Sequence, residues 1–201
     1  SSMADCAWIG YDDARAAVSR PIKGVGFSVP SFLGAPASSV RRFARGSVIV
    51  HRLRPCDYHR FHAPFDCTVR GIRTIEARHR VSLSVDPSMT VHPDLNPFLH
   101  NKRVIVECDV FGTRCYIVVI GAFNVASISL NVRPGDSVRR YDEMGYFAYG
   151  GSCVVLLLPP HAATFDEPFF ARNARRGRET YLRVGERVGA LRITRSTVER
   201  S

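Results

Sequence analysis

The chain has 201 residues, of which 45% are apolar, and it carries a formal net charge of +10 at pH 7. The apolar share excludes a chain that is disordered throughout, and the length suits one domain with its own core. No apolar run approaches the roughly 20 residues that a membrane-spanning helix needs.

The N-terminal part predicts little regular structure. Residues 12–18 predict a short helix with acidic residues at its start, ended by Pro21. Glycines and prolines between residues 24 and 36 then indicate a loop-rich stretch.

From Ser47 onward the pattern is typical of strands. Apolar and β-branched runs of strand length alternate with turn residues. The predicted strands are Ser47–Leu53, Thr68–Glu76, Arg103–Val110, Arg114–Gly121, Val125–Val132, Cys153–Leu158 and Ala190–Thr194. Phe111-Gly112-Thr113 between two of them predicts a hairpin connection. We therefore expect a mostly β (α+β) fold over residues 1–201, a single compact antiparallel domain resembling a barrel or sandwich, with short peripheral helices.

Basic residues accumulate toward the C-terminus. These are Arg172, Arg175, Arg176, Arg178, Arg183, Arg187, Arg192 and Arg195. Such a surface favours polyanions, either nucleic acid or acidic lipid headgroups. Because no zinc-finger, helix-turn-helix or base-stacking signature accompanies the charge, we expect no nucleic-acid partner. A solvated basic face without a dedicated partner is the alternative.

The six cysteines are scattered without CxxC or CxxH spacing, so we expect no metal site. Cys108 and Cys115 could bridge neighbouring strands, or could be small buried hydrophobic residues. The cysteine pattern indicates a reducing, intracellular compartment.

Two segments carry the residues capable of chemistry. Asp57, His59 and His62 lie within six residues, just after a predicted strand. An HxxH pair can bind metal, but further ligands at recognisable spacing are missing, and a structural histidine is the commoner outcome. The second segment places Ser152 directly after two glycines, at the edge of the apolar run Val154–Leu158. A histidine acting as general base could activate this serine hydroxyl. The hydroxyl could then attack a substrate or the chain itself, since the two glycines have no side chains to block the approach.

The segment Asp57–Pro64 resembles the DYHRFHxP motif of the phosphatidylserine decarboxylase family, which is pyruvoyl-dependent. Further segments match family motifs in order, from about residue 4 to residue 193. They are Ala4-Asp5-Cys6, Ile22-Lys23-Gly24, Ser84–Pro87, Asn101–Val104, Gly121–Ile128, Glu143–Phe147, Gly150-Gly151-Ser152 and Glu179–Gly189. One departure lies next to the serine, where Cys153 stands in place of the usual Thr or Ser.

The resemblance implies a self-processing triad of Asp5, His62 and Ser152. Cleavage between Gly151 and Ser152 would give residues 1–151 and 152–201, and Ser152 would become the pyruvoyl cofactor. His59 would take part in decarboxylation, with Asp57 supporting that imidazole.

The implied activity is that of a carboxy-lyase of phospholipid biosynthesis. It would convert phosphatidylserine to phosphatidylethanolamine and CO2 through a Schiff base, as a peripheral membrane protein on an anionic surface. A homodimer is expected from the family, and the organelle stays open.

Two other functions stay open at this point. One is a soluble decarboxylase of a free, for example aromatic, amino acid on the same fold, and the other is an unprocessed, non-enzymatic lipid-binding relative. Phe27, Val29, Phe32 and Leu33 could enter the headgroup region of a membrane, whereas Phe32 and Leu33 could equally lie in the core.

Overall fold

The computed structural model describes residues 1–15, 28–78, 83–86, 96–122, 127–148, 151–166, 173 and 176–193. Within these ranges the chain is mostly antiparallel β with a few short helices, which confirms the predicted fold class.

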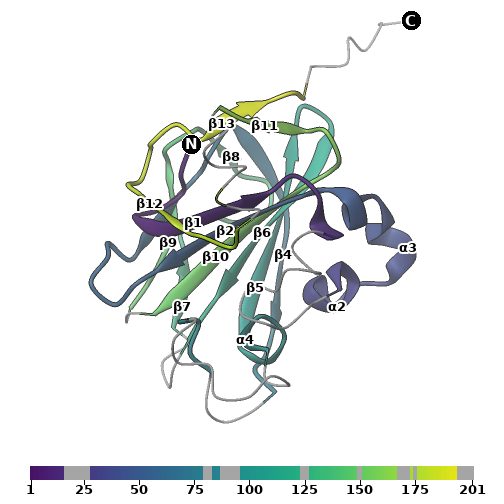
Figure 1. The fold of residues 1–201 in the computed structure, drawn as a ribbon. Coiled ribbons are helices and arrows are strands. Elements are labelled where there is room, and N and C mark those ends of the chain that lie inside the picture. Colours follow the sequence, from purple (N-terminus) through teal and green to yellow (C-terminus); the bar gives the residue numbers. More distant parts are fainter. Residues whose placement is uncertain are drawn as a thin grey trace, which may run out of the picture.

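One large sheet organises the molecule (Figure 1). Its eight strands run in the order β12-β1-β2-β10-β6-β5-β4-β8, and every neighbouring pair is antiparallel. The strands are β1 (Cys6–Tyr11), β2 (Ser47–Leu53), β4 (Cys67–Ile75), β5 (Arg103–Val110), β6 (Thr113–Ile120), β8 (Ser137–Val138), β10 (Ser152–Leu158) and β12 (Thr180–Leu182). Because β12 and β8 end this order without pairing to each other, the described strands form an open sheet and no closed barrel.

Two smaller sheets accompany the large one. The first has the order β3-β9-β7, from β3 (Arg60–His62), β9 (Glu143–Phe147) and β7 (Ile128–Leu130). The second pairs β11 (Ala163–Phe165) with β13 (Gly189–Leu191).

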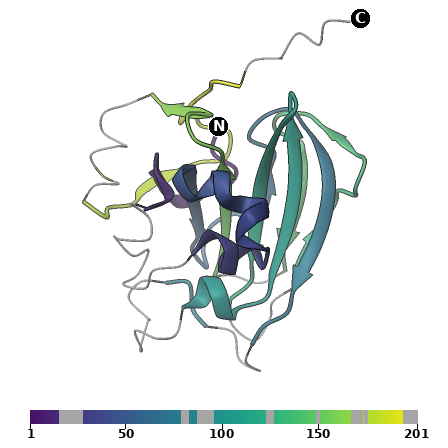
Figure 2. The ribbon, with the colours of Figure 1, turned by 90° about the vertical axis from the view of Figure 1, so that its right-hand side faces the viewer.

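The middle of the large sheet is buried on both faces. Val154, Leu156 and Leu158 of β10 belong to one apolar core, and Cys153, Val155 and Leu157 belong to the other. The smaller sheets contribute to the first core. The second core is closed by α2 (Val29–Leu33), α3 (Ala37–Val40), the 3₁₀ helix η2 (Arg41–Arg45) and α4 (Pro97–His100). Figure 2 shows these helices on one side of the sheet. Burial on both sides explains why β10 reads as a continuous apolar run.

Most predicted strands agree with the structure. β2 and β5 match residue for residue, and β4, β6 and β10 begin one residue earlier than predicted. The hairpin is confirmed: Phe111 and Gly112 both have positive φ, 50° and 81°, as a type I′ turn requires. β7 and β13 are shorter in the described residues than the predicted strands. Of the helix predicted at 12–18, Ala14 and Arg15 are helical, and residues 16–18 lie outside the described residues.

Two open points about side chains are resolved. Val29, Phe32 and Leu33 are buried, so the interpretation that they enter a membrane is wrong; Phe27 lies outside the described residues. Cys108 and Cys115 face each other across β5 and β6 as free, buried thiols, so they do not form a disulfide.

Candidate active site

Ser152 is the first residue of β10, and its side chain is buried at the sheet end. Its Oγ has no hydrogen-bond partner. The preceding Gly151 has φ +83°, a left-handed backbone that suits glycine and strains other residues. Gly150 lies outside the described residues. The peptide bond between Gly151 and Ser152 is therefore flanked by a buried hydroxyl without a hydrogen-bond partner and by a glycine, which has no side chain. Cys153 points into the opposite core, away from this hydroxyl.

His62 lies on β3 and is held from two directions. Its backbone N–H donates to the Met3 carbonyl at 2.8 Å, and its Nδ1 lies 2.9 Å from the Tyr141 carbonyl oxygen. The Tyr58 ring stacks against the imidazole with 6.1 Å between ring centroids. Because a carbonyl oxygen only accepts, Nδ1 carries the proton and Nε2 keeps its lone pair. That Nε2 is buried without a partner, as a general base awaiting a proton would be.

The Tyr141 carbonyl is fixed by an unusual backbone. Tyr141 has φ +77°, which is uncommon for a residue with a side chain. Its N–H donates to the Ala63 carbonyl at 2.9 Å, so β3 and the turn at Tyr141 are tied together on both sides of His62. Strained residues of this kind cluster at functional sites. No sequence signal indicates this contact, since it involves only the backbone of Tyr141.

Asp5 stands just before β1, at the same end of the sheet as Ser152. Ala7, Arg52 and Cys153 form one row across β1, β2 and β10, with neighbouring strands about 4.8 Å apart. The Asp5 carboxylate accepts a hydrogen bond from the Val184 N–H at 2.8 Å. Thus Asp5 and Ser152 lie at the same end of the large sheet, and the His62 backbone is tied to Met3, two residues before Asp5. Among the described residues no hydrogen bond joins any two of the three side chains.

His59 repeats the arrangement of His62. Its Nδ1 lies 2.6 Å from the Asp57 carbonyl oxygen, so Nδ1 donates and Nε2 holds the lone pair. This Nε2 is also buried without a partner. The His59 backbone carbonyl accepts a hydrogen bond from the Phe147 N–H at 2.9 Å. This bond ties the His59 backbone to β9, the strand that leads toward Gly151.

Asp57 touches His59 through its carbonyl and not through its carboxylate. The carboxylate is 2% exposed and accepts from the Arg54 N–H at 2.7 Å and from the Arg54 guanidinium. Burial acts to raise the pKa of this carboxyl, but the hydrogen bonds from Arg54 outweigh burial and leave the pKa below its ordinary value. The guanidinium also stacks on the Tyr181 ring at 4.4 Å. Sequence reasoning assigned no role to Arg54, which lies outside the motifs, or to Tyr181, which lies within the matched segment Glu179–Gly189.

Unpartnered polar atoms are concentrated here. The described residues contain six buried side-chain nitrogen or oxygen atoms without a hydrogen-bond partner. Three of them are His59 Nε2, His62 Nε2 and Ser152 Oγ. Because such groups normally find partners, their concentration indicates a site prepared for chemistry. The described residues hold no group of three or more His, Cys, Asp or Glu able to bind a metal ion.

Comparison with known proteins agrees with the motifs. Residues 1–190 match the family model for phosphatidylserine decarboxylase. The chain belongs to the phosphatidylserine decarboxylase family. It is 38% identical over 190 residues to phosphatidylserine decarboxylase proenzyme 3 of Schizosaccharomyces pombe. The aligned region covers 94% of this chain and 19% of that protein.

Two bacterial relatives of the family are similarly close. The phosphatidylserine decarboxylase proenzyme of Chlamydia pneumoniae is 38% identical over 170 residues, covering 84% of this chain and 54% of that protein. The proenzyme of Chlamydia felis is 36% identical over 187 residues, covering 92% of this chain and 60% of that protein. The chain thus spans less than two thirds of the length of each of these relatives.

Proposed function

We propose that this chain forms the catalytic part of a phosphatidylserine decarboxylase that makes its own pyruvoyl group from Ser152. The observation that carries the proposal is the buried, unpartnered Ser152 Oγ, directly after Gly151 at φ +83°. Family membership supports the reaction class, and the geometry supports the residue that supplies the cofactor.

His62 starts the self-processing as general base. Its Nε2 accepts the Ser152 Oγ proton while Oγ bonds to the Gly151 carbonyl carbon. The carbon–nitrogen bond then breaks, the nitrogen takes up the proton, and the peptide becomes an ester. Loss of the Ser152 Cα proton with cleavage of the Cβ–O bond releases residues 1–151 with a terminal carboxylate. The dehydroalanine left on residues 152–201 hydrolyses with water to pyruvoyl and ammonia.

The residues at the cleavage point fit a pyruvoyl group. Ser152 is at a strand end where its own hydroxyl makes no hydrogen bond, so its conversion breaks no side-chain hydrogen bond among the described residues. The group would supply a ketone able to condense with the substrate amine and to take up the electron pair left behind when CO2 departs. His59 is positioned by the Asp57 carbonyl to hold a proton at Nδ1 and to deliver or accept one at Nε2.

The surroundings of His62 support docking on an anionic membrane. Tyr58, Tyr141 and Tyr181 are 44%, 49% and 47% exposed, and each lies beside His62 or the Asp57–Arg54 pair. Arginine stacks on two of these tyrosines: Arg140 on Tyr141 and Arg54 on Tyr181. Tyrosine and arginine side chains suit the headgroup layer because each joins an apolar body to a polar end. Among the described residues, no helix combines the length and apolar character needed to cross a bilayer.

The proposal is tested by CO2 release from three substrates: phosphatidylserine in vesicles, free serine and a free aromatic amino acid. We expect release from phosphatidylserine and co-sedimentation with anionic vesicles. Activity confined to a free amino acid in lipid-free buffer would reject the lipid substrate while keeping the reaction. No release from any substrate by a cleaved protein would reject the reaction.

A further inference from the structure

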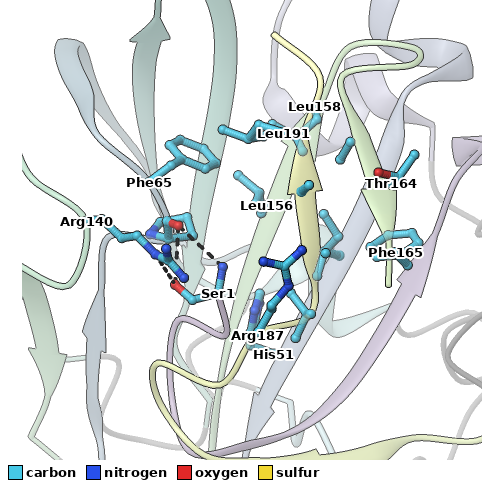
Figure 3. A pocket seen from close by; sticks show the side chains of 16 residues that line it. Ser1, His51, Phe65, Arg140, Leu156, Leu158, Thr164, Phe165, Arg187 and Leu191 are labelled. Carbon is cyan, nitrogen blue, oxygen red and sulfur yellow. Dashed lines mark hydrogen bonds between the residues drawn. The ribbon is translucent and has the colours of Figure 1, made fainter. Parts of the chain in front are cut away.

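A cavity lies between the large sheet and the β11–β13 pair (Figure 3). None of Asp5, His59, His62 and Ser152 lines it, and Arg140, which stacks on Tyr141, forms part of its wall. Its volume is about 270 Å³, near the lower end of the range of ligand pockets, roughly 300 Å³. Most of its wall is apolar, formed by Ile49, Phe65, Leu156, Leu158, Phe165 and Leu191. A cavity of this size and lining suits an alkyl chain.

One polar side chain is buried in this wall. His51 is 1% exposed, and its Nδ1 lies 3.2 Å from the Val154 carbonyl oxygen. Nδ1 therefore donates, and Nε2 carries a lone pair that has no partner. Burial lowers the pKa of His51 to about 3, so the ring stays neutral at physiological pH. His51 Nε2 thus acts as a permanent acceptor and calls for a ligand that donates a hydrogen bond.

Two arginines also line the cavity, Arg140 and Arg187, and Figure 3 shows them on different sides of it. Arg187 pairs with Asp166 through Nε and Nη2, which leaves the N–H groups of Nη1 for a ligand. The Arg140 Nε lies 3.5 Å from Ser1 Oγ. Two guanidinium groups against one carboxylate leave an excess of positive charge beside an apolar cavity.

From these features we infer that the cavity binds a single-chain phosphate amphiphile with a free hydroxyl beside the phosphate, the chemistry of a lysophosphatidic acid. The alkyl chain fills the apolar wall, the hydroxyl donates to His51 Nε2, and the phosphate meets Arg140 and Arg187. A phosphate monoester offers three acceptor oxygens and close to two negative charges, which suits two guanidinium groups better than one carboxylate does.

The chain contains its own reporter for this site. Trp8 is the single tryptophan, and it lies opposite His51 in the register of β1 and β2. Its ring meets Phe165, which lines the cavity, edge-on at 5.5 Å between centroids. Tryptophan emission therefore reports whether the cavity is occupied.

The binding experiment uses the full chain with Ser152→Ala, so self-processing and decarboxylation do not enter the result. The probe is 1-lauroylglycerol 3-phosphate below its micelle concentration. It is compared with monolauroylglycerol, which lacks the phosphate, and with lauryl phosphate, which lacks the hydroxyl. We expect saturable binding, tightest for the probe that carries both groups.

Two substitutions separate the contacts. Arg187 is largely exposed, so Arg187→Gln should keep the fold and weaken the two phosphate probes about tenfold, with monolauroylglycerol unchanged. Arg114→Gln, in another exposed ion pair, serves as control and should change nothing. His51→Leu should weaken the two hydroxyl probes about tenfold and spare lauryl phosphate, while His51→Gln restores an acceptor.

The result has two clear alternatives. Equal affinity for all three probes, insensitive to Arg187→Gln, would show a merely apolar cavity and overturn the inference. Absence of any saturable emission change with the folded protein would overturn it as well. Neither outcome bears on the proposed decarboxylase function, which is measured by CO2 release.

Discussion

His62 Nδ1 lies 2.9 Å from the Tyr141 carbonyl oxygen, and this contact determines which imidazole nitrogen keeps its lone pair. In the described structure the orienting acceptor for His62 is therefore a backbone carbonyl, while the Asp5 carboxylate is engaged by the Val184 N–H. The orientation of the base depends on Tyr141 holding φ at +77°.

The backbone at Tyr141 gives the first prediction. Tyr141→Gly should keep self-cleavage close to the wild-type rate, because glycine adopts positive φ easily and keeps the carbonyl in place. Tyr141→Val should slow cleavage at least tenfold, since a β-branched residue resists this conformation. The rate of fragment appearance on denaturing gels measures both. Phe111, at φ 50° in a hairpin of the large sheet, offers the matched control: Phe111→Val should leave the rate unchanged. Equal rates for both Tyr141 variants would show that the carbonyl does not position His62.

Two substitutions of Asp5 separate the effect of its negative charge from the effect of its hydrogen bond with the Val184 N–H. Asp5→Asn keeps an oxygen that accepts from the Val184 N–H, so the fold should be retained. Self-cleavage should slow at least tenfold, because the imidazolium formed at His62 loses a nearby negative charge. Asp5→Ala should show the same slowing and in addition lose about 1–3 kcal/mol of stability from the orphaned N–H. Normal cleavage by a folded Asp5→Asn protein would remove Asp5 from the triad.

Substitution of His59 should separate self-cleavage of the chain from decarboxylation of the substrate. His59→Asn keeps a donor near the position of Nδ1 and removes the ring nitrogen with the free lone pair. We expect normal cleavage, with CO2 release from phosphatidylserine lowered roughly 10²–10⁴-fold. His161→Asn, at an exposed histidine, is the control for a general effect of losing an imidazole. Unaltered CO2 release would contradict the assigned role.

The sequence predicted those parts of the fold where local pattern and burial agree. β5 and β6 are apolar runs joined by a short turn that contains Gly112, which is typical of a hairpin. The continuous apolar run of β10 is typical of a strand buried on both faces. β1 was not predicted, because its pairing with β2 and β12 depends on residues far away in the chain. Likewise, the motif indicated His62 and Ser152, but nothing in the sequence indicated the Tyr141 carbonyl or the Arg54 contact of Asp57.

The buried His51 predicts a pH dependence of stability. Its pKa is about 3 in the folded chain and 6.5 ordinarily, so between these values the unfolded chain binds more protons. Stability is therefore fully present above pH 6.5 and falls as pH decreases toward 3. The slope due to His51 is about 1.4 kcal/mol per pH unit. Denaturant unfolding of Ser152→Ala, with and without His51→Gln, should show this extra loss in the parent only. Parallel losses in the two proteins would mean that His51 does not titrate on unfolding.

Intact mass under denaturing conditions tests the self-cleavage at Ser152 most directly. Purified wild-type chain should give two polypeptides, residues 1–151 and residues 152–201, the smaller one with pyruvoyl in place of Ser152 and reducible by borohydride. Ser152→Ala should give one full-length mass. A wild-type chain that stays at its full-length mass of 22.4 kDa, without a borohydride-reactive carbonyl, would contradict the proposed catalyst.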